Sequence, residues 1–236
     1  MPLVAVPKIK AAHRDYEFFG GLIKGPLRSG KSSYAIQILA EAYGSPENPN
    51  WDAWKKYLVF KPEEFSERCR WARKTRKQQL LLVWDDAGFW LSAYTWNENL
   101  SKAISKIMNV IATLWASVLF TAPAEKWVLT KVRHLPGGHR VNIAKLTGNK
   151  YQKDLRRARW YKRWTTPDEK KSGVVPIMED FYSVRLPNKV FHEYDSYRRE
   201  YTEEAQDLLD SAIEGLRKKR GENVAENFRK AFEDSA

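Results

Sequence analysis

The residues best suited to chemistry form a glycine-rich run that ends in lysine and serine, G-x-x-x-x-G-K-S, from Gly25 to Ser32. Glycines let the backbone wrap closely around phosphate groups, so that its amides can point at phosphate oxygens. The lysine is expected to reach the β- and γ-phosphates of ATP, and the hydroxyl of Ser32 to bind Mg²⁺. The predicted nucleotide-binding residues are Gly25, Pro26, Leu27, Arg28, Ser29, Gly30, Lys31, Ser32 and Ser33.

A pair of acidic residues provides a second motif, because Asp85 and Asp86 directly follow the apolar run Leu80 to Trp84. A buried parallel strand delivers its last residues to the sheet edge at which nucleotides bind. Asp85 is therefore predicted to hold Mg²⁺ through water, and Asp86 to orient or deprotonate the attacking water. Glutamate is more usual in that second role, so either Asp86 performs it with a shorter reach or hydrolysis is slow. Capping of the segment from Ala87 is the alternative for Asp86.

Two further residues are candidates because of their positions after these motifs. Thr121 follows the apolar run Ser117 to Phe120, and its hydroxyl is predicted to contact the γ-phosphate or the water. Simple termination of the strand is the alternative. Arg133 lies 12 residues later, where an arginine at a subunit edge would reach a neighbouring copy's nucleotide, unless it is an ordinary surface residue. With Lys31 and Asp86, these two residues complete the predicted catalytic set.

These motifs require a core in which strands and helices alternate. Apolar runs bounded by polar residues predict buried strands, and helical spacing predicts the helices between them. The predicted strands are 18–24, 57–60, 80–84, 117–120 and 140–146, and the predicted helices are 31–43, a helix from Pro62, and 101–115. This order indicates an α/β P-loop NTPase of the added-strand class, with a parallel sheet of about five strands flanked by helices.

The pattern changes after about residue 150. Residues 156–164 and 177–186 alternate as antiparallel strands do, and a turn-rich stretch joins them. Two helices are predicted beyond Pro187, over 203–220 and 222–232, with Gly221 between them at a carboxyl-cap position. We therefore predict a P-loop ATPase core over 1–150, and a β-hairpin with a helical appendage packed on that core over 151–236.

Composition restricts the class of protein. The single cysteine, Cys69, excludes an internal disulfide, and four scattered histidines give no zinc-ligand spacing. No apolar run approaches the roughly 20 residues of a membrane-spanning helix, and the amino end lacks the apolar segment of a signal peptide. We therefore expect no membrane partner and a cytoplasmic location. The formal charge of +12 favours polyanionic partners, of which nucleic acid is the most obvious.

Basic residues concentrate in two segments, 68–77 and 150–163. Lysine and arginine can follow a nucleic-acid backbone, and aromatic side chains can stack on unpaired bases. The second segment is the better candidate for DNA binding because aromatic residues are interleaved with it, namely Tyr151, Trp160, Tyr161 and Trp164. Solvated charged faces are an equal alternative for both segments. No module that reads base sequence is visible, so the prediction is limited to contacts with the DNA backbone.

Four segments together carry a family resemblance: Gly25 to Ser32, VWDDAGFWL (83–91), FTAP (120–123) and EDFYSVRLPNKVFHEYDSYRREY (179–201). With them the chain resembles the DnaA-like or AAA+-like P-loop ATPases of archaeal spindle-shaped viruses, the fuselloviruses, and related plasmids. The resemblance implies a role in replicating or maintaining an extrachromosomal genome. It also implies the roles given above for Lys31, Ser32, Asp85, Asp86 and Thr121.

The predicted function is that of a magnesium-dependent ATPase, assembled as a homo-oligomer, which acts on DNA during replication or maintenance of such a genome. Other replication or virion proteins are further candidate partners. A DNA-packaging or translocating motor is one alternative, and an ATP-switched binding protein with little turnover is another. A small-molecule phosphotransferase is disfavoured by the position of the aspartate strand in the predicted order.

Overall fold

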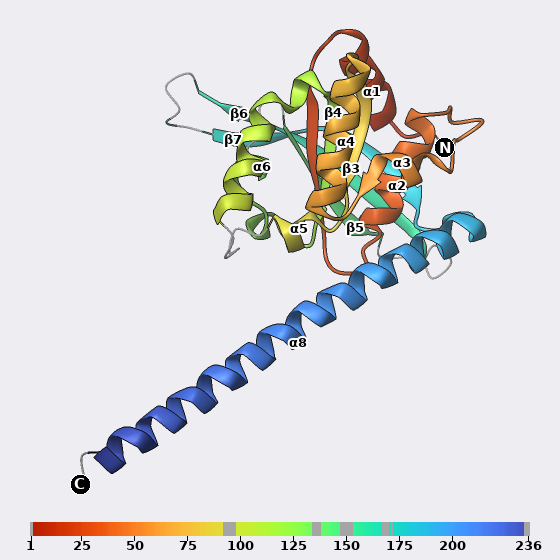
Figure 1. The fold of residues 1–236 in the computed structure, drawn as a ribbon. Helices are drawn as coiled ribbons and strands as arrows, with labels where there is room; N and C mark the ends of the chain where they lie inside the picture. The colour runs from red at the N-terminus through yellow and green to blue at the C-terminus, as the bar shows by residue number, and fades with distance from the viewer. Residues whose placement is uncertain are drawn as a thin grey trace. The chain divides into compact units, whose positions relative to one another are not determined.

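The computed structural model describes residues 2–91, 98–133, 138–146, 153–166, 170 and 172–233. The chain divides into two compact units, Met1–Leu186 and Pro187–Ala236. The first unit holds a mixed sheet with helices around it, and the second consists of one long helix in its described part (Figure 1).

Seven strands form one sheet in the described part of the chain, in the order β2-β3-β4-β1-β5-β6-β7. The strands are β1 (Phe19–Lys24), β2 (Leu58–Val59), β3 (Gln79–Trp84), β4 (Trp115–Ala122), β5 (His139–Lys145), β6 (Leu155–Thr165) and β7 (Ser172–Ser183). The first five in sheet order are parallel. The last two are antiparallel. The predicted fold class, including five parallel strands and the added strand β4 between β3 and β1, is confirmed.

The helices are α1 (Ala5–Arg14), α2 (Lys31–Ala42), α3 (Ala53–Tyr57), α4 (Pro62–Thr75), α5 (Ala87–Trp90), α6 (Glu98–Val110), α7 (Thr130–Arg133) and α8 (Asn188–Glu233). Two 3₁₀ turns cover Ile111–Thr113 and Glu125–Trp127. Helix α1 was not among the predicted elements. Pro62 stands at the first position of α4, where its missing N–H costs no hydrogen bond.

Apolar side chains fill both faces of the parallel strands. On one face, Trp84 of β3 and Phe120 of β4 are fully buried in a cluster that includes residues of α4 and α6. Burial of each such side chain stabilises the fold by about 1.5–3 kcal/mol. On the other face, α2 approaches the sheet, since the hydroxyl of Tyr43 donates to the carbonyl of Leu81 at 2.8 Å. The core therefore fixes α2, β3 and β4 relative to one another.

The β6–β7 hairpin continues the central sheet. Strand β6 pairs with β5 along the whole of β5, from His139↔Lys162 to Lys145↔Arg156. Its Trp160 is fully buried, and a Cβ at Gly21 of β1 would lie 3.4 Å from the indole ring. Because the hairpin is joined to the core in this way, the structure places the division of the chain after Leu186 rather than after residue 150.

The second unit contains α8, which runs without interruption from Asn188 to Glu233. The prediction of two helices separated at Gly221 is therefore wrong. A glycine inside a helix costs about 1 kcal/mol relative to alanine, which is a weak penalty that neighbouring helix-forming residues can overcome. No helix in the described residues is long and apolar enough to cross a membrane.

A buried carboxylate connects the amino-terminal helix to the hairpin. Asp180 of β7 is 2% exposed and accepts hydrogen bonds from the backbone N–H groups of Val4 and Ala5 at the start of α1. It also accepts one from the hydroxyl of Tyr34 in α2. That hydroxyl in turn accepts the indole N–H of Trp160 at 2.7 Å. A residue late in the sequence thus caps the first helix, because N–H groups in a first turn lack partners within the helix.

Replacing Asp180 with alanine should destabilise the first unit. The substitution leaves the hydroxyl of Tyr34 and two helix N–H groups without their acceptor, and we expect a loss of about 2–4 kcal/mol in the free energy of unfolding. Urea denaturation followed by circular dichroism measures this loss. Asp195→Ala, which removes an exposed ion pair in α8, is the control and should change the midpoint little. A change below about 0.5 kcal/mol for Asp180→Ala would contradict the proposed importance of this network.

The same carboxylate should give stability a dependence on pH. Burial raises the pKa of Asp180 above its ordinary value, against the opposing effect of its hydrogen bonds from Tyr34 and the start of α1. Because the folded-state pKa is the higher one, the contribution is complete below the unfolded-state pKa near 4 and is lost as the pH rises through the folded-state value. The melting temperature of Asp180→Asn relative to wild type should therefore rise between pH 4 and pH 7. A difference that is independent of pH would show that Asp180 is not responsible.

Candidate nucleotide-binding site

The loop between β1 and α2 has the conformation that a phosphate-binding loop needs. Gly30 has φ +94°, in the left-handed region that favours glycine. A Cβ added to Gly30 would lie 2.4 Å from Cγ1 of Val184. A Cβ at Gly25 would lie 2.9 Å from the carbonyl oxygen of Ile143. Both glycines are therefore required by the backbone path, and the loop between them leads directly into the amino terminus of α2.

Lys31 is the first residue of α2 and its side chain crosses the loop. It is 7% exposed, and its Nζ donates to the carbonyl oxygens of Gly25 and Pro26, each at 3.0 Å. The ammonium group thus lies within the concave side of the loop, where the helix amino terminus also favours negative charge. These features fit the phosphate groups of a nucleotide.

Asp85 lies at the carboxyl end of β3, in hydrogen-bonding contact with two hydroxyl groups. Strands β3 and β4 pair through Trp84↔Phe120, so the next residues, Asp85 and Thr121, stand side by side. The hydroxyl of Thr121 donates to the carboxylate, and Ser32 Oγ donates to Asp85 Oδ1 at 3.1 Å. Asp85 is fully buried. The predicted metal-binding residues are therefore adjacent, although their roles in catalysis stay predictions.

Asp86 occupies a left-handed backbone conformation, with φ 46° and ψ 35°. Aspartate adopts this conformation more readily than most residues. Its backbone N–H donates to the hydroxyl of Thr121 at 2.8 Å, so Thr121 links both aspartates. Asp86 precedes α5, but its side chain makes no capping hydrogen bond to that helix. The capping alternative therefore lacks its expected contact, and Asp86 is partly exposed.

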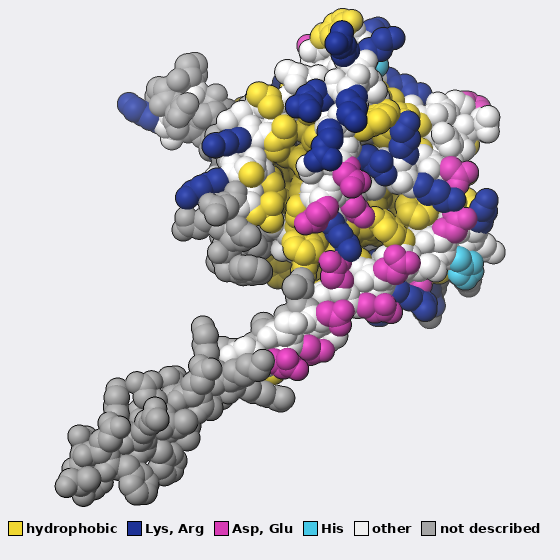
Figure 2. Space-filling model, in the orientation of Figure 1, with side chains coloured by type: hydrophobic (Ala, Val, Ile, Leu, Met, Phe, Trp, Pro, Cys, Tyr) yellow, Lys and Arg dark blue, Asp and Glu magenta, His cyan; other side chains and the backbone are white. Residues whose placement is uncertain are grey.

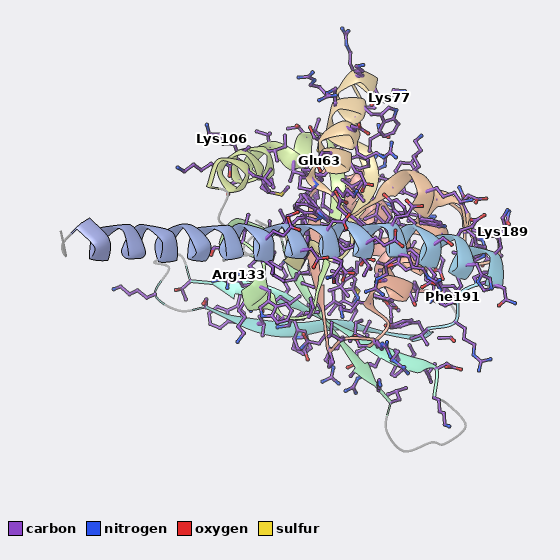
Figure 3. All side chains as sticks on the ribbon, turned by 60° about the horizontal axis from the view of Figure 1, so that its bottom comes forward. Glu63, Lys77, Lys106, Arg133, Lys189 and Phe191 are labelled. Atoms are coloured by element: carbon purple, nitrogen blue, oxygen red, sulfur yellow. The ribbon has the colours of Figure 1, made fainter. Side chains whose placement is uncertain are left out.

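Arg133 ends α7 and makes its side-chain contact locally. One guanidinium nitrogen donates to the hydroxyl of Thr130 at 2.8 Å, and Nε is buried without a hydrogen-bond partner among the described residues. No hydrogen bond joins Arg133 to Lys31, Asp85 or Asp86 in the described part of the chain. Figure 3 labels its position. The role predicted for it, in a neighbouring copy, stays a prediction.

Two residues of the hairpin contact the loop, and the sequence did not point to either. Arg156 Nε donates to the carbonyl oxygen of Ser29 at 3.1 Å, and the hydroxyl of Tyr182 donates to the carbonyl oxygen of Gly30 at 3.0 Å. Arg156 belongs to the basic segment 150–163, which was predicted to lie on the surface. The alternation Arg156, Ala158, Trp160 was the available signal, since these residues share one face of β6.

Magnesium fits the donor set beside the loop. The ion prefers six oxygen ligands and usually keeps several waters, so it needs only a few ligands from the protein. Ser32 and Asp85 would provide these, directly or through water, and the phosphates would provide others. The other predicted loop residues include Pro26, Leu27 and Arg28, which are exposed, and Ser33, which is partly buried. Ser29 is 2% exposed and its hydroxyl has no hydrogen-bond partner among the described residues.

Comparison with other sequences finds similar proteins of archaeal viruses. No protein-family model matches the chain. It is 26% identical over 223 residues to uncharacterized protein B-251 of Sulfolobus spindle-shape virus 1, covering 88% of this chain and 84% of that protein. It is 27% identical over 139 residues to uncharacterized protein ORF286 of Acidianus two-tailed virus, covering 55% of this chain and 47% of that protein.

Two solved structures are distantly similar to the chain. One is the amino-terminal domain of zonular occludens toxin from Neisseria meningitidis, with 13% identity, a TM-score of 0.42, and coverage of 75% of this chain and 98% of that one. The other is the genome packaging NTPase B204 of Sulfolobus turreted icosahedral virus 2 in complex with ATP-gammaS, with 10% identity, a TM-score of 0.34, and coverage of 69% and 98%.

The strand order and the glycine-rich loop together identify the fold class of the chain. A glycine-rich loop follows β1, an aspartate follows β3, and β4 stands between these two strands. The resulting order of parallel strands, with Lys31 and Asp85 at one sheet edge, is that of a P-loop NTPase. The predicted similarity to proteins of archaeal viruses is confirmed. Membership of the DnaA-like or AAA+-like ATPases of those viruses stays a prediction.

Removing the hydroxyl of Thr121 should disturb both aspartates. Thr121→Val leaves the Asp85 carboxylate and the Asp86 N–H each without one hydrogen bond, and we expect a loss of stability of about 1–3 kcal/mol. We also expect nucleotide hydrolysis to fall at least tenfold, or about 1.4 kcal/mol in the barrier. Thermal melts and a phosphate-release assay measure the two effects. Thr113→Val is the matched control, since its hydroxyl contacts only an exposed carbonyl, that of Val110. If both variants had the same melting temperature and the same rate of phosphate release, the predicted role of Thr121 in the site would be wrong.

Proposed function

We propose that the chain binds and hydrolyses Mg-ATP, and that it uses this hydrolysis to act on DNA during replication or maintenance of an archaeal viral genome. The observation that carries the ATPase part is the contact of Ser32 and Thr121 with the buried carboxylate of Asp85, beside Lys31. A turn that binds no ligand has no need for this arrangement of a buried lysine, a buried aspartate and two hydroxyls. The viral origin of the similar proteins B-251 and ORF286 supports the biological context.

Each residue of the site has a distinct part in the proposed hydrolysis. Lys31 offsets the negative charge that develops on the β- and γ-phosphates, together with the backbone amides at the start of α2. Magnesium, held by Ser32 and Asp85, would supply Lewis-acid stabilisation of the same charge. Asp86 accepts a hydrogen bond from the attacking water, directs it toward the γ-phosphate and takes up its proton, and its short side chain favours slow turnover. Thr121 holds Asp85 and the backbone of Asp86 in place.

We further propose that DNA binds the face of the hairpin that points away from α1 and α2. We call it the outer hairpin face and define it as Arg157, Arg159, Tyr161, Arg163 and Phe181. Arg157, Arg159 and Phe181 alternate with buried residues along their strands, and cross-strand pairing places Phe181 opposite Arg157. Tyr161 and Arg163 continue the same face of β6, where their neighbours Lys162 and Trp164 are exposed. The arginines can follow phosphates, and the aromatic rings can stack on unpaired bases.

The charge of the outer hairpin face is only partly neutralised. Arg159 forms an ion pair with Glu179 of β7, and this pairing raises the pKa of its guanidinium. Arg157 and Arg163 form no ion pair with any described residue. Trp160 was one of the aromatic residues predicted to stack on bases, but it is fully buried and cannot contact DNA. Trp164 is 44% exposed, whereas Lys150 and Tyr151 lie outside the described residues.

The other basic segment, 68–77, is less suited to nucleotide-dependent binding. It ends α4 and leads into the amino end of β3, so it lies at the sheet edge opposite the phosphate-binding loop. The helix is acidic in its first turn, at Glu63 and Glu64, and basic in its last, at Arg73 and Lys74. Figure 2 shows this separation of charge, and Figure 3 labels Glu63 in the first turn of α4 and Lys77 just beyond its last residue. Such a distribution stabilises a helix through its dipole without any ligand.

Steady-state ATP hydrolysis with and without DNA tests the proposed function. We expect single-stranded DNA to stimulate wild type, and Asp86→Asn to bind ATP while its turnover falls by at least tenfold, because the amide cannot accept the proton of the attacking water. Lys31→Ala is the control that should lose nucleotide binding. Absence of any ATP hydrolysis by wild type with either form of DNA would contradict the enzyme assignment and favour an ATP-controlled binding protein.

The same assay separates two biological roles. A loader or initiator should show weak turnover that saturates on short DNA. A translocating or packaging motor should instead show fast turnover that rises with DNA length, in a closed assembly of several copies. Sedimentation of the protein with ATP and DNA measures that assembly.

Arg133→Ala tests the predicted action of Arg133 on a neighbouring copy. Loss of DNA-stimulated hydrolysis without loss of ATP binding would support that action.

Charge removal on the outer hairpin face should weaken DNA binding without affecting ATP binding. Arg157→Gln combined with Arg163→Gln removes two cations that lack ion-pair partners among the described residues. The logarithm of the affinity decreases as the logarithm of the salt concentration increases. We expect this dependence to become shallower by about 1.4 in slope for single-stranded DNA, because two phosphate contacts are lost. Fluorescence anisotropy with a labelled oligonucleotide measures the slope. The matched control, Arg73→Gln with Lys74→Gln in α4, should leave the slope unchanged; the reverse result would move the DNA site to the 68–77 segment.

A further inference from the structure

The phosphate-binding loop is supported from behind by residues that come much later in the chain. Arg156 of β6 donates to the carbonyl of Ser29, and Tyr182 of β7 donates to the carbonyl of Gly30. Val184 lies close enough to Gly30 that no side chain fits there, since an added Cβ would approach its Cγ1 to 2.4 Å. Two hairpin residues thus hydrogen-bond two successive peptide groups of the loop, and Val184, directly after β7, lies beside Gly30.

The geometry of the peptide group relates these contacts to phosphate binding. In a trans peptide the C=O of one residue and the N–H of the next point in opposite directions within one plane. A hydrogen bond that fixes the carbonyl of Ser29 therefore fixes the N–H of Gly30 toward the opposite side. In the same way, a hydrogen bond to the carbonyl of Gly30 fixes the N–H of Lys31. Amides at the start of a helix are the ones that bind anions.

Arg156 is buried beside the loop rather than exposed on the surface. It is 7% exposed although it is charged, and a buried guanidinium requires hydrogen-bond partners. Its Nε donates to the carbonyl of Ser29, and NH1 donates to the carbonyls of Lys153 and Leu155 at 2.6 and 2.9 Å. All of these acceptors are backbone oxygens. The cation therefore connects the start of β6 to the loop.

Tyr182 keeps its proton under physiological conditions. Burial raises the pKa of its phenol above the ordinary value, against a smaller opposing effect of Arg156. The hydroxyl therefore remains a donor to the carbonyl of Gly30 across the range in which the protein would work. That carbonyl also accepts the first hydrogen bond of α2, from the N–H of Tyr34 at 3.0 Å. Tyr182 thus reinforces an orientation that the helix already favours.

We propose that Arg156 and Tyr182 are positioning residues that aim the amides of Gly30 and Lys31 at the nucleotide phosphates. The inference rests on the proposed binding of ATP. A charged donor on a carbonyl also polarises the peptide group, so the attached N–H becomes a stronger donor to phosphate. The contribution of Arg156 is the larger one, because it is charged and because Gly30 has a second donor besides Tyr182.

The affinity for a fluorescent ATP analogue, measured without DNA, tests this inference. We expect Tyr182→Phe to raise Kd about two- to fivefold and Arg156→Gln about tenfold, as loss of one neutral and one charged hydrogen bond would do. Arg156→Lys retains a charged donor and should recover part of the loss. Tyr16→Phe and Arg14→Gln are the matched controls, since both side chains are exposed, and neither should change Kd.

Amide chemical shifts distinguish aiming of the loop from general stabilisation. In ¹⁵N–¹H spectra of the protein without nucleotide, Arg156→Gln should shift the amide of Gly30, and Tyr182→Phe should shift that of Lys31, because each loses the hydrogen bond on its own peptide carbonyl. Thermal melts of the same samples report on stability. If melting temperatures fall while the two amide shifts and Kd stay at wild-type values, the residues support the fold only and the inference is overturned.

Lys31→Ala separates failure of this inference from failure of the proposed function. If wild type binds the analogue, Lys31→Ala does not, and both hairpin variants bind as wild type does, then ATP binding stands and positioning by the hairpin is overturned. If wild type and Lys31→Ala bind equally, or neither binds, then the proposed function fails and the inference fails with it. Increased Kd in both hairpin variants, with the expected order, supports the inference.

Discussion

The buried carboxylate of Asp85 is the interaction on which the site depends. An ionised carboxylate without access to water is costly unless hydrogen bonds compensate it. Here the hydroxyls of Ser32 and Thr121 donate to it, and they come from α2 and β4 while Asp85 follows β3. Because the Asp85 carboxylate needs these hydrogen bonds, α2, β3 and β4 must meet at this edge of the sheet. The apolar cluster around Trp84 and Phe120 holds β3 and β4 together on one face of the sheet, and α2 packs on the other face.

Sequence patterns were sufficient for the parallel core. Continuous apolar runs mark strands that are buried on both faces, and β1, β3, β4 and β5 lie close to where such runs placed them. The glycine-rich loop and the two aspartates were also recognisable, because each motif requires particular residue types at fixed spacing. The proximity of Thr121 to the aspartates followed from the order of the strands, which the sequence also indicated.

Other features depend on tertiary contacts that local pattern does not encode. The alternation in β6 shows that Arg156 and Arg157 face opposite sides, but it does not show which side is buried, and Arg156 was assigned to the surface. Gly221 has a poor propensity for helix, yet α8 continues through it. Helix α1 carries only a short amphipathic pattern, and its amino end is capped by Asp180, which is 176 residues away from Val4.

The long sequence separation of these contacts also has a consequence for synthesis of the protein. Ser29 and its donor Arg156 are 127 residues apart, which a ribosome takes about 6 to 25 seconds to translate. During that interval the phosphate-binding loop has left or is leaving the ribosome without the hairpin that completes its surroundings. The nascent chain therefore acquires its nucleotide site as one of the last steps of folding, after the parallel strands have been made.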